Sequence, residues 1–566
     1  MLAFPLQYTR KISRWAALGL FLISVQIARA DNSKISPDLL PLLQQPSANI
    51  NVIVQYNTSP SSGAGLLGGV VNLLDGVVNL VFSLIPAVAA TLHPADVLAL
   101  SNQSNVAYIS LDRSLGATLD YSAGAVNAPA AWNAGLDGSG VGIAIIDSGI
   151  YSHPDLNGVN SSQSRVVYRQ SFIGGNQFDD FGHGTHVAGI AAGNASQSSG
   201  PGAYHTYRGI APNANLLDLR VLDANGSSND SVVIAAIQKA VQLKNRYNVR
   251  VINLSLGRPI YEGCAHDPLC QAVEAAWNNG IVVVTAAGNL GRNGYGTILS
   301  PGDSPHAITV GCMKTEMTVT RADDLIASYS SKGPTYIDLT AKPDLVAPGN
   351  LVVSLLAPGS TLEADYPGNV IPSSQYTTSA SVGAPAYFRL SGTSMATPVV
   401  SGAVALLLEK NPNLTPDTIK ARLMKTASKN FPASSTAYDP TTGQSYTDVY
   451  DMFTVGAGYL DIAAVLANND YVLTSAASPQ MYYNQAQQTA YLVPNFLSTW
   501  WLGSTWSPQV VWGSVVLTPG SAGSPAVWDS GVAWGTSGQW GTAVAWGTGG
   551  TSGTAVAWGT SGQGEQ

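Results

Sequence analysis

Three short stretches carry residues that together could perform nucleophilic catalysis. Residues 391–398 read Ser-Gly-Thr-Ser-Met-Ala-Thr-Pro, and the apolar run behind them has helical spacing, so Ser394 is predicted at a helix N-terminus. Pro398 is expected near the first turn, where its missing N–H costs little. Unpaired N–H groups and the helix dipole favour negative charge there, which suits a serine beside a developing oxyanion. Taken alone, the stretch also fits a serine that merely caps a helix.

The other two stretches offer a general base and a group to orient it. Residues 144–149 form a buried-strand pattern that ends on Asp147, and residues 182–189 place His183 among glycines at the start of another apolar helix. Serine, histidine and aspartate are the nucleophile, the base and the orienting group of one catalytic device. The order Asp, His, Ser along the chain is one of several on which this chemistry converged. The three stretches together favour catalysis over capping.

In content, order and spacing these segments closely resemble the subtilisin-like serine peptidases, or subtilases, over about residues 120 to 467. The resemblance implies a triad of Asp147, His183 and Ser394. It also implies that Asn289, in the Ala-Ala-Gly-Asn segment 286–289, donates to the oxyanion beside the backbone N–H of Ser394. An amide suits that role because it aims a dipole without adding charge, although a lone Asn after Gly is more often a turn residue. The substrate-binding residues implied are Ser255, Leu256, Gly257, Ala287 and Gly288.

Metal and cofactor chemistry is not expected in the reaction. His186 makes a His-x-x-His pair with His183, but no acidic partner at metal-binding spacing accompanies it, and the resemblance implies a structural role. His153 is interpreted as a loop residue near the cleft. Relatives often bind structural calcium, for which Asp155 is an acidic candidate; a solvated loop carboxylate is the alternative, and calcium stays unassigned.

From about residue 121, strand and helix patterns alternate, which predicts an α/β fold: a doubly wound parallel sheet with helices on both faces. In such sheets, sites form at the carboxyl ends of strands. Asp147 ends one predicted strand, and segment 286–289 follows another. The predicted strands are 141–147, 216–221, 249–254 and 281–284, and the predicted helices 232–243, 269–277 and a last one at 461–466.

The first 30 residues read as a secretory signal, with basic residues at 10–14, an apolar core at 15–25 and Ala-Arg-Ala at 28–30. An uncleaved anchor is the alternative. Secretion implies an oxidising compartment. Cys264 and Cys270 lie close together in one loop, and their pairing would leave Cys312 unpaired, but the sequence leaves other pairings open.

Residues 31–120 look like a small α/β unit similar to the subtilase propeptide, which helps the enzyme to fold and then blocks its cleft. Its predicted strands are 51–56, 84–92 and 106–111, with a short helix at 94–100. Residues 65–80 are apolar with one polar stripe, Asn72, Asp75 and Asn79, at helical spacing. A membrane helix over 66–84 is the rival interpretation, and Asp75 near its centre disfavours it by a few kcal/mol.

Residues 468–566 are a low-charge tail with a 12-residue Trp/Gly repeat. Val-Ala-Trp-Gly occurs at 532–535, 544–547 and 556–559, with a looser copy at 511–513. The copies either stack as short strands or form a largely flexible end. Partial order to about residue 515 is expected.

Composition sets the remaining expectations. The chain of 566 residues allows two to four domains, and its 11 % of charged residues suits an extracellular protein. A net charge of −8 without a basic run gives no reason to expect nucleic-acid binding. We expect a secreted, autoprocessed serine endopeptidase: a monomer with protein or peptide substrates and its own propeptide as partners, and with cell-surface association through the tail.

Two other function classes fit the sequence less well. A non-catalytic surface or adhesion protein on a subtilase scaffold is disfavoured, because inactive relatives usually lose at least one of the triad residues or the oxyanion asparagine. A lipase or esterase is weaker still, since Ser394 is not in a Gly-x-Ser-x-Gly elbow.

Overall fold

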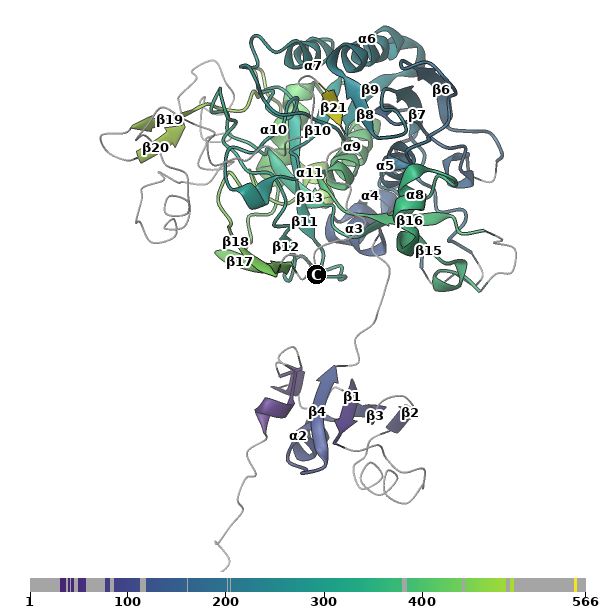
Figure 1. The fold of residues 1–566 in the computed structure, drawn as a ribbon, viewed down its shortest axis with the longest axis vertical. Helices are drawn as coiled ribbons and strands as arrows, with labels where there is room; N and C mark the ends of the chain where they lie inside the picture. The colour runs from purple at the N-terminus through teal and green to yellow at the C-terminus, as the bar shows by residue number, and fades with distance from the viewer. Residues whose placement is uncertain are drawn as a thin grey trace, which may run out of the picture. The chain divides into compact units, whose positions relative to one another are not determined.

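The computed structural model divides the chain into two compact units, residues 1–115 and 116–566 (Figure 1). It describes residues 31–36, 39–40, 42–44, 49–57, 77–81, 86–111, 119–159, 161–200, 202–203, 205–378, 384–439, 443–484, 489–492 and 554–556. The predicted signal, most of the apolar stretch 65–80 and most of the repeat tail lie outside these ranges. Within them, no helix is long and apolar enough to cross a membrane.

The first unit is an antiparallel sheet whose strands follow the order β2-β3-β1-β4. Strand β1 alternates buried and more exposed residues, as expected for a sheet with one face on a core. The elements are η1 (Asn32–Lys34), η2 (Leu42–Gln44), β1 (Ile50–Tyr56), β2 (Val77–Val81), β3 (Ala87–Leu92), α2 (Pro94–Ser101) and β4 (Val106–Leu111).

One expectation for this unit was wrong. The helical spacing of polar residues over 65–80 does not produce a helix at its end, because 77–81 is the strand β2, paired antiparallel with β3. Three valines in five residues favour a strand, and pairing outweighs the helical pattern. A membrane helix over 66–84 is contradicted for the same residues. The other predicted strands and the short helix are found within three residues of their expected bounds.

The second unit is built on an eight-stranded sheet with the order β12-β11-β10-β9-β5-β7-β6, where β13 also pairs with β11. All pairs are parallel except β11 with β12. The strands are β5 (Gly142–Asp147), β6 (Val166–Ser171), β7 (Asn215–Arg220), β9 (Val249–Leu254), β10 (Val282–Ala286), β11 (Ile308–Lys314), β12 (Leu325–Ile326) and β13 (Leu345–Pro348).

Both faces of this sheet are covered. Along β5, Ile143 and Ile145 face one apolar core, and Ala144 and Ile146 face another. The first core is shared with α5 (His183–Ala192) and α9 (Thr393–Lys410), and the second with α6 (Asp230–Tyr247) and α7 (Pro268–Asn278). Figure 1 shows α6 and α7 together on one side of the strands. The predicted doubly wound parallel sheet is confirmed.

The remaining elements frame this sheet. The helices are α3 (Leu119–Ala125), α4 (Ala128–Asn133), η3 (Pro154–Leu156), η4 (Gly291–Asn293), α8 (Thr361–Asp365), η5 (Pro367–Asn369), η6 (Ser373–Gln375), α10 (Pro416–Thr426) and α11 (Ile462–Ala467). The strands are β8 (Ser227–Asn229), β14 (Val352–Leu355), β15 (Val370–Ile371), β16 (Tyr387–Leu390), β17 (Ser434–Asp439), β18 (Gln444–Val449), β19 (Met481–Asn484), β20 (Thr489–Leu492) and β21 (Thr554–Val556).

The chain beyond α11 remains packed on the second unit as far as Ser478. A buried charge cluster has Asp344 within 2.7 Å of the Lys342 ammonium and 3.1 Å of that of Lys420. Ser478 completes it, because its hydroxyl donates to Asp344 over 2.6 Å and accepts from Lys420 over 2.8 Å. These contacts tie the chain to the second unit as far as Ser478, beyond the predicted start of the tail at residue 468.

Candidate active site

Three neighbouring strands bring the predicted site residues to one edge. In the order β10-β9-β5, Asn289 follows the first, Ser255 the second, and Asp147 is the last residue of the third. Parallel strands present their carboxyl ends at the same edge, so residues from distant parts of the sequence meet there.

His183 and Asp147 form a buried hydrogen-bonded pair. His183 is the first residue of α5, and its Nδ1 lies 2.7 Å from Asp147 Oδ1. The backbone N–H of Ser148 donates to the same oxygen over 2.7 Å. Since a carboxylate accepts, Nδ1 carries the proton and Nε2 keeps its lone pair. In the part of the chain that the structure describes, Nε2 has no hydrogen-bond partner, so it is available to take a proton.

Asp179, which sequence reasoning missed, holds the start of α5. Gly182 offers no side-chain cap, and the Asp179 carboxylate accepts instead from the N–H groups of Gly182 (2.7 Å) and Thr185 (2.8 Å). It also accepts from the hydroxyls of Ser148 and Thr185 over 2.7 and 2.6 Å. Burial raises the pKa of Asp179, against these hydrogen bonds. An acidic residue shortly before the glycine that precedes the helix was the available sequence signal.

Ser394 is the second residue of α9, the helix that packs against α5. It is buried, and its hydroxyl donates to the carbonyl of Ser255 over 3.1 Å rather than to His183. In enzymes without substrate, catalytic hydrogen bonds are often loose and tighten only when substrate binds. Ser394 and His183 thus stand at the N-termini of two adjacent helices.

Pro398 lies deeper in the helix than the sequence predicted. Because α9 begins at Thr393, Pro398 is its sixth residue, and its missing N–H deprives the carbonyl of Ser394 of its helical partner. The hydroxyl of Ser255 supplies that hydrogen bond over 2.8 Å. Asn253 in turn donates to the Ser255 hydroxyl over 2.9 Å. The helix at the serine is therefore completed by a side chain from the neighbouring strand end.

Asn289 is fixed by Thr393, a second residue whose role sequence reasoning missed. The N–H and the hydroxyl of Thr393 donate to Asn289 Oδ1 over 2.9 and 3.1 Å. Because the partner is a backbone N–H, the acceptor is the amide oxygen, which assigns the other branch of the amide as NH₂. The Thr393 hydroxyl also accepts from Gly288 N–H over 3.1 Å. Thr393 directly precedes Ser394, so the amide and the serine are positioned by one helix turn.

The predicted substrate segments lie at the same edge. Ser255 and Leu256 are buried, and a Cβ on Gly257 would approach the Leu299 side chain to 3.0 Å. Ala287 is held by hydrogen bonds to strand β11 and to Leu299. Gly288 has φ of 108°, which L side chains rarely adopt, so glycine is required there.

The other polar candidates have structural contacts. His186 Nε2 lies between the carbonyls of Val352 and Phe388 at 3.2 and 3.0 Å, and burial lowers its pKa to about 3. It is a neutral donor with a structural role, as predicted. His153 is a loop residue, as predicted, and it is buried as the N-cap of η3. Both oxygens of Asp155 accept hydrogen bonds, one of them from Tyr387 over 2.6 Å.

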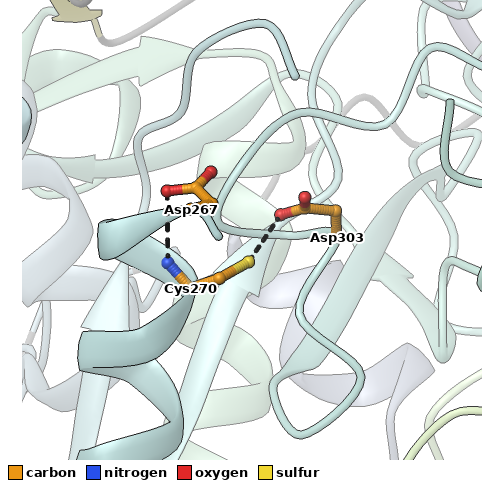
Figure 2. Close-up of side chains that lie close together, drawn as sticks. All are labelled: Asp267, Cys270 and Asp303. Atoms are coloured by element: carbon orange, nitrogen blue, oxygen red, sulfur yellow. Dashed lines mark hydrogen bonds between the residues drawn. The ribbon is translucent and has the colours of Figure 1, made fainter. Parts of the chain in front are cut away.

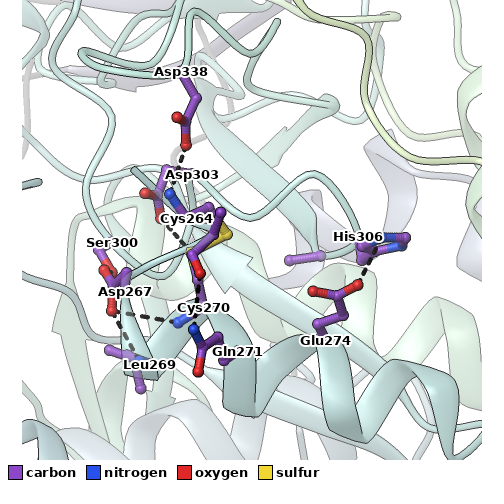
Figure 3. Close-up of a disulfide and its surroundings, with 12 residues drawn as sticks. Cys264, Asp267, Leu269, Cys270, Gln271, Glu274, Ser300, Asp303, His306 and Asp338 are labelled. Carbon is purple, nitrogen blue, oxygen red and sulfur yellow. Dashed lines mark hydrogen bonds and ion pairs between the residues drawn. A yellow bond between two sulfur atoms is a disulfide. The ribbon is translucent and has the colours of Figure 1, made fainter. Parts of the chain in front are cut away.

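One cluster of side chains in the described ranges has the residue types and spacing of a metal site. The donor atoms of Asp267, Cys270 and Asp303 lie within 4.8 Å of one another (Figure 2). Cys270, however, forms a disulfide with Cys264, one of the pairings that the sequence left open, and Figure 3 shows that bond at the start of α7. Asp267 already pairs with Arg258 at 2.9 Å and caps α7. We assign the group to the structural support of this loop and no ion to it. Cys312 is buried and takes part in no disulfide.

The sequence of the chain is similar to those of known peptidases. The model of the subtilase family (Peptidase_S8) matches residues 138–453. The chain is 39 % identical over 332 residues to serine protease AprX of Bacillus subtilis (strain 168), covering 57 % of this chain and 70 % of that protein. It is 34 % identical over 353 residues to subtilisin E of the same organism, covering 61 % and 76 %. The solved structure of Sphericase covers 57 % of this chain and 92 % of its own, with 28 % identity and a TM-score of 0.43.

Proposed function

The chain belongs to the subtilase family of serine endopeptidases, and from this we propose that Ser394 is its nucleophile, His183 its general base and Asp147 the group that orients the base. His183 Nε2 takes the hydroxyl proton as Oγ attacks the peptide carbonyl. Asp147 holds the proton on Nδ1 and stabilises the imidazolium that forms. His183 then protonates the leaving amine, and water releases the acyl group from Ser394. Subtilases need no cofactor for this chemistry.

The oxyanion of the tetrahedral intermediate rests on two donors in this proposal. One is the backbone N–H of Ser394 at the N-terminus of α9, where the helix dipole adds to the attraction. The other is the amide NH₂ of Asn289, whose orientation Thr393 secures. Substrate backbone is proposed to lie along Ser255, Leu256 and Gly257, with Ala287 and Gly288 beside it.

The observation that carries the proposal is the buried pair of His183 and Asp147, whose imidazole leaves Nε2 unpartnered among the described residues. Asp147→Asn keeps the shape but favours the wrong tautomer, so kcat on a small chromogenic peptide should fall about 10⁴-fold. Asp137→Asn is the control and should keep full kcat, because the half-buried Asp137 carboxylate accepts from Ser139 and Asn213 and does not contact the triad. Equal kcat in both variants would reject the assignment.

The proposal includes export and maturation. Residues 1–30 direct secretion, residues 31–120 act as a propeptide, and the enzyme removes it by its own activity. The support is that the first unit has its own apolar core and sheet. Expressed in a host whose own proteases are inhibited, Ser394→Ala should remain at precursor size. Normal maturation of that variant would contradict self-processing and leave the triad proposal standing on the kcat measurements.

A further inference from the structure

The C-terminal repeat, which has no part in the proposed catalysis, meets the catalytic unit at one strand. β21 pairs antiparallel with β8, with Thr554 opposite Asn229 and Val556 opposite Ser227 (Figure 1). Over the described ranges, β8 has no other strand partner. Apart from the bonds that join Ser227 to Asp223 in the preceding turn, the backbone of β8 is therefore a sheet edge of the kind that accepts an extended peptide as an added strand.

β8 lies beside the candidate active site. The chain that leads to it passes the carbonyl of Asp147, which accepts from Val221 N–H over 2.8 Å. It then turns at Gly226, where a Cβ would come within 2.7 Å of the Phe181 ring. The Phe181 ring in turn lies 6.3 Å from that of His183. The approach to β8 is thus in contact with the residues that surround the base.

An ion pair connects β8 to the proposed substrate segment. Arg258, the residue after Gly257, pairs at 2.9 Å with Asp230, the residue after β8. Arg258 is buried and bonds Asp267 as well, so this link is held from both sides. Two backbone segments that flank the site are thereby fixed to each other. An extended segment added to β8 lies where we place the substrate backbone.

We propose that the C-terminal repeat is an intramolecular competitor of substrate, in which Thr554–Val556 adds to β8 as an antiparallel strand and occupies the edge that a substrate peptide must use. This inference rests on the proposed function. The sequence Gly-Thr-Ala-Val-Ala-Trp-Gly-Thr occurs at both 541–548 and 553–560, so two copies carry the same binding segment. The roughly 60 residues between β20 and β21 can span up to about 200 Å, so reach does not limit the contact.

The effect of the attached tail on KM can be predicted from the Ki of the free peptide. Attachment to the same chain gives the segment an effective concentration on the order of 1 mM. If the free peptide 553–560 inhibits a chain ending at Asn484 with a Ki of about 0.1 mM, the attached tail should raise the apparent KM about tenfold and leave kcat unchanged. The experiment measures that Ki, with a scrambled peptide as control, and compares KM for full-length and truncated enzyme. Equal KM values despite peptide inhibition, or no inhibition by the peptide, would overturn the proposal.

A full-length pair of variants separates docking from any damage by truncation. Proline removes the N–H that a ladder requires, so Val532→Pro, Val544→Pro and Val556→Pro together should lower KM as truncation does. The control triple, Ser537→Pro, Thr551→Pro and Ser561→Pro, lies outside the Val-Ala-Trp-Gly copies and should keep the parent KM. An equal KM in both triples would count against docking.

Hydrogen exchange measures the contact between β21 and β8 independently of enzyme activity. In the mature full-length enzyme, exchanged in the cold to limit autolysis, the amides of Ser227–Asn229 should exchange more slowly than in the mature chain ending at Asn484. Equal exchange would overturn the docking itself. If Ser394→Ala and the parent enzyme hydrolyse the peptide equally, the proposed function fails, whereas the exchange result still decides whether the tail binds β8.

Discussion

The hydrogen bond from Ser255 to the carbonyl of Ser394 should be worth more than an ordinary buried hydroxyl contact. Pro398 cannot serve that carbonyl, so Ser255→Ala leaves it buried without a donor, at a cost of about 1–3 kcal/mol. For the second unit up to Asn484, an unfolding entropy of about 2.1 cal/mol/K per residue converts this into a fall in Tm of roughly 1–4 °C. Thermal unfolding is measured in the Ser394→Ala background, which excludes autolysis.

Ser354→Ala is the matched control. The buried hydroxyl of Ser354 also donates to a helix carbonyl, that of His186, over 2.8 Å. The residue four positions further along α5 is Ile190, which has an N–H, so this carbonyl keeps a helical donor when the hydroxyl is removed. The net cost should be about 0.5–1.5 kcal/mol, below that of Ser255→Ala.

A double-mutant cycle decides the cause. Pro398→Ala restores the N–H that can reach the Ser394 carbonyl. Its effect on the free energy of unfolding should therefore be more favourable by at least about 1 kcal/mol in the Ser255→Ala background than in the parent. Packing lost with the proline ring cancels between the two arms. If Pro398→Ala has the same effect with and without the Ser255 hydroxyl, the freed carbonyl is not what Ser255 stabilises, and the reasoning is refuted.

Three further outcomes are expected. Asn289→Ala should lower kcat by about 10²–10³, a magnitude carried over from subtilisin, with KM nearly unchanged. Thr393→Val should lower kcat about tenfold because the Asn289 amide loses a hydrogen bond, and Thr393→Ser should restore kcat. An unaffected kcat would place the oxyanion elsewhere. Burial, followed by the charge of Asp267, raises the pKa of Asp303 from 3.8 to about 7. The ionised carboxylate is therefore penalised in the folded protein, increasingly as pH rises from about 4 to 7. Asp303→Asn should thus stabilise the Ser394→Ala chain by up to about 3 kcal/mol more at pH 8 than at pH 5, and an equal Tm gain at both would contradict this. Truncation after Asn484 should preserve hydrolysis of a small peptide, whereas truncation after residue 470 should lower Tm by removing Ser478 from the cluster of Asp344 and Lys420; equal Tm values would restore the earlier boundary.

The sequence determined the class of fold and the identity of the candidate catalytic residues. Strand and helix periodicities are local, so the alternation from residue 121 onward predicted a doubly wound sheet that the structure confirms. Asp147, His183 and Ser394 were visible because each stands where a regular element begins or ends, and element ends are marked by glycine and small residues. The disulfide of Cys264 with Cys270 was one of several pairings that the sequence allowed.

Only the tertiary structure decided how these residues are held. The role of Asp179 depends on where α5 starts, that of Thr393 on its distance from Asn289, and that of Ser255 on a carbonyl left open by Pro398. The contacts of Thr393 and Ser255 join a side chain to backbone more than 100 positions away in the sequence, for which a pattern within one segment carries no signal, whereas the Asp179 contact is local and had one. The strand β2 and the pairing of β21 with β8 have the same cause: a strand is completed by a partner elsewhere in the chain, so its own residues do not determine it.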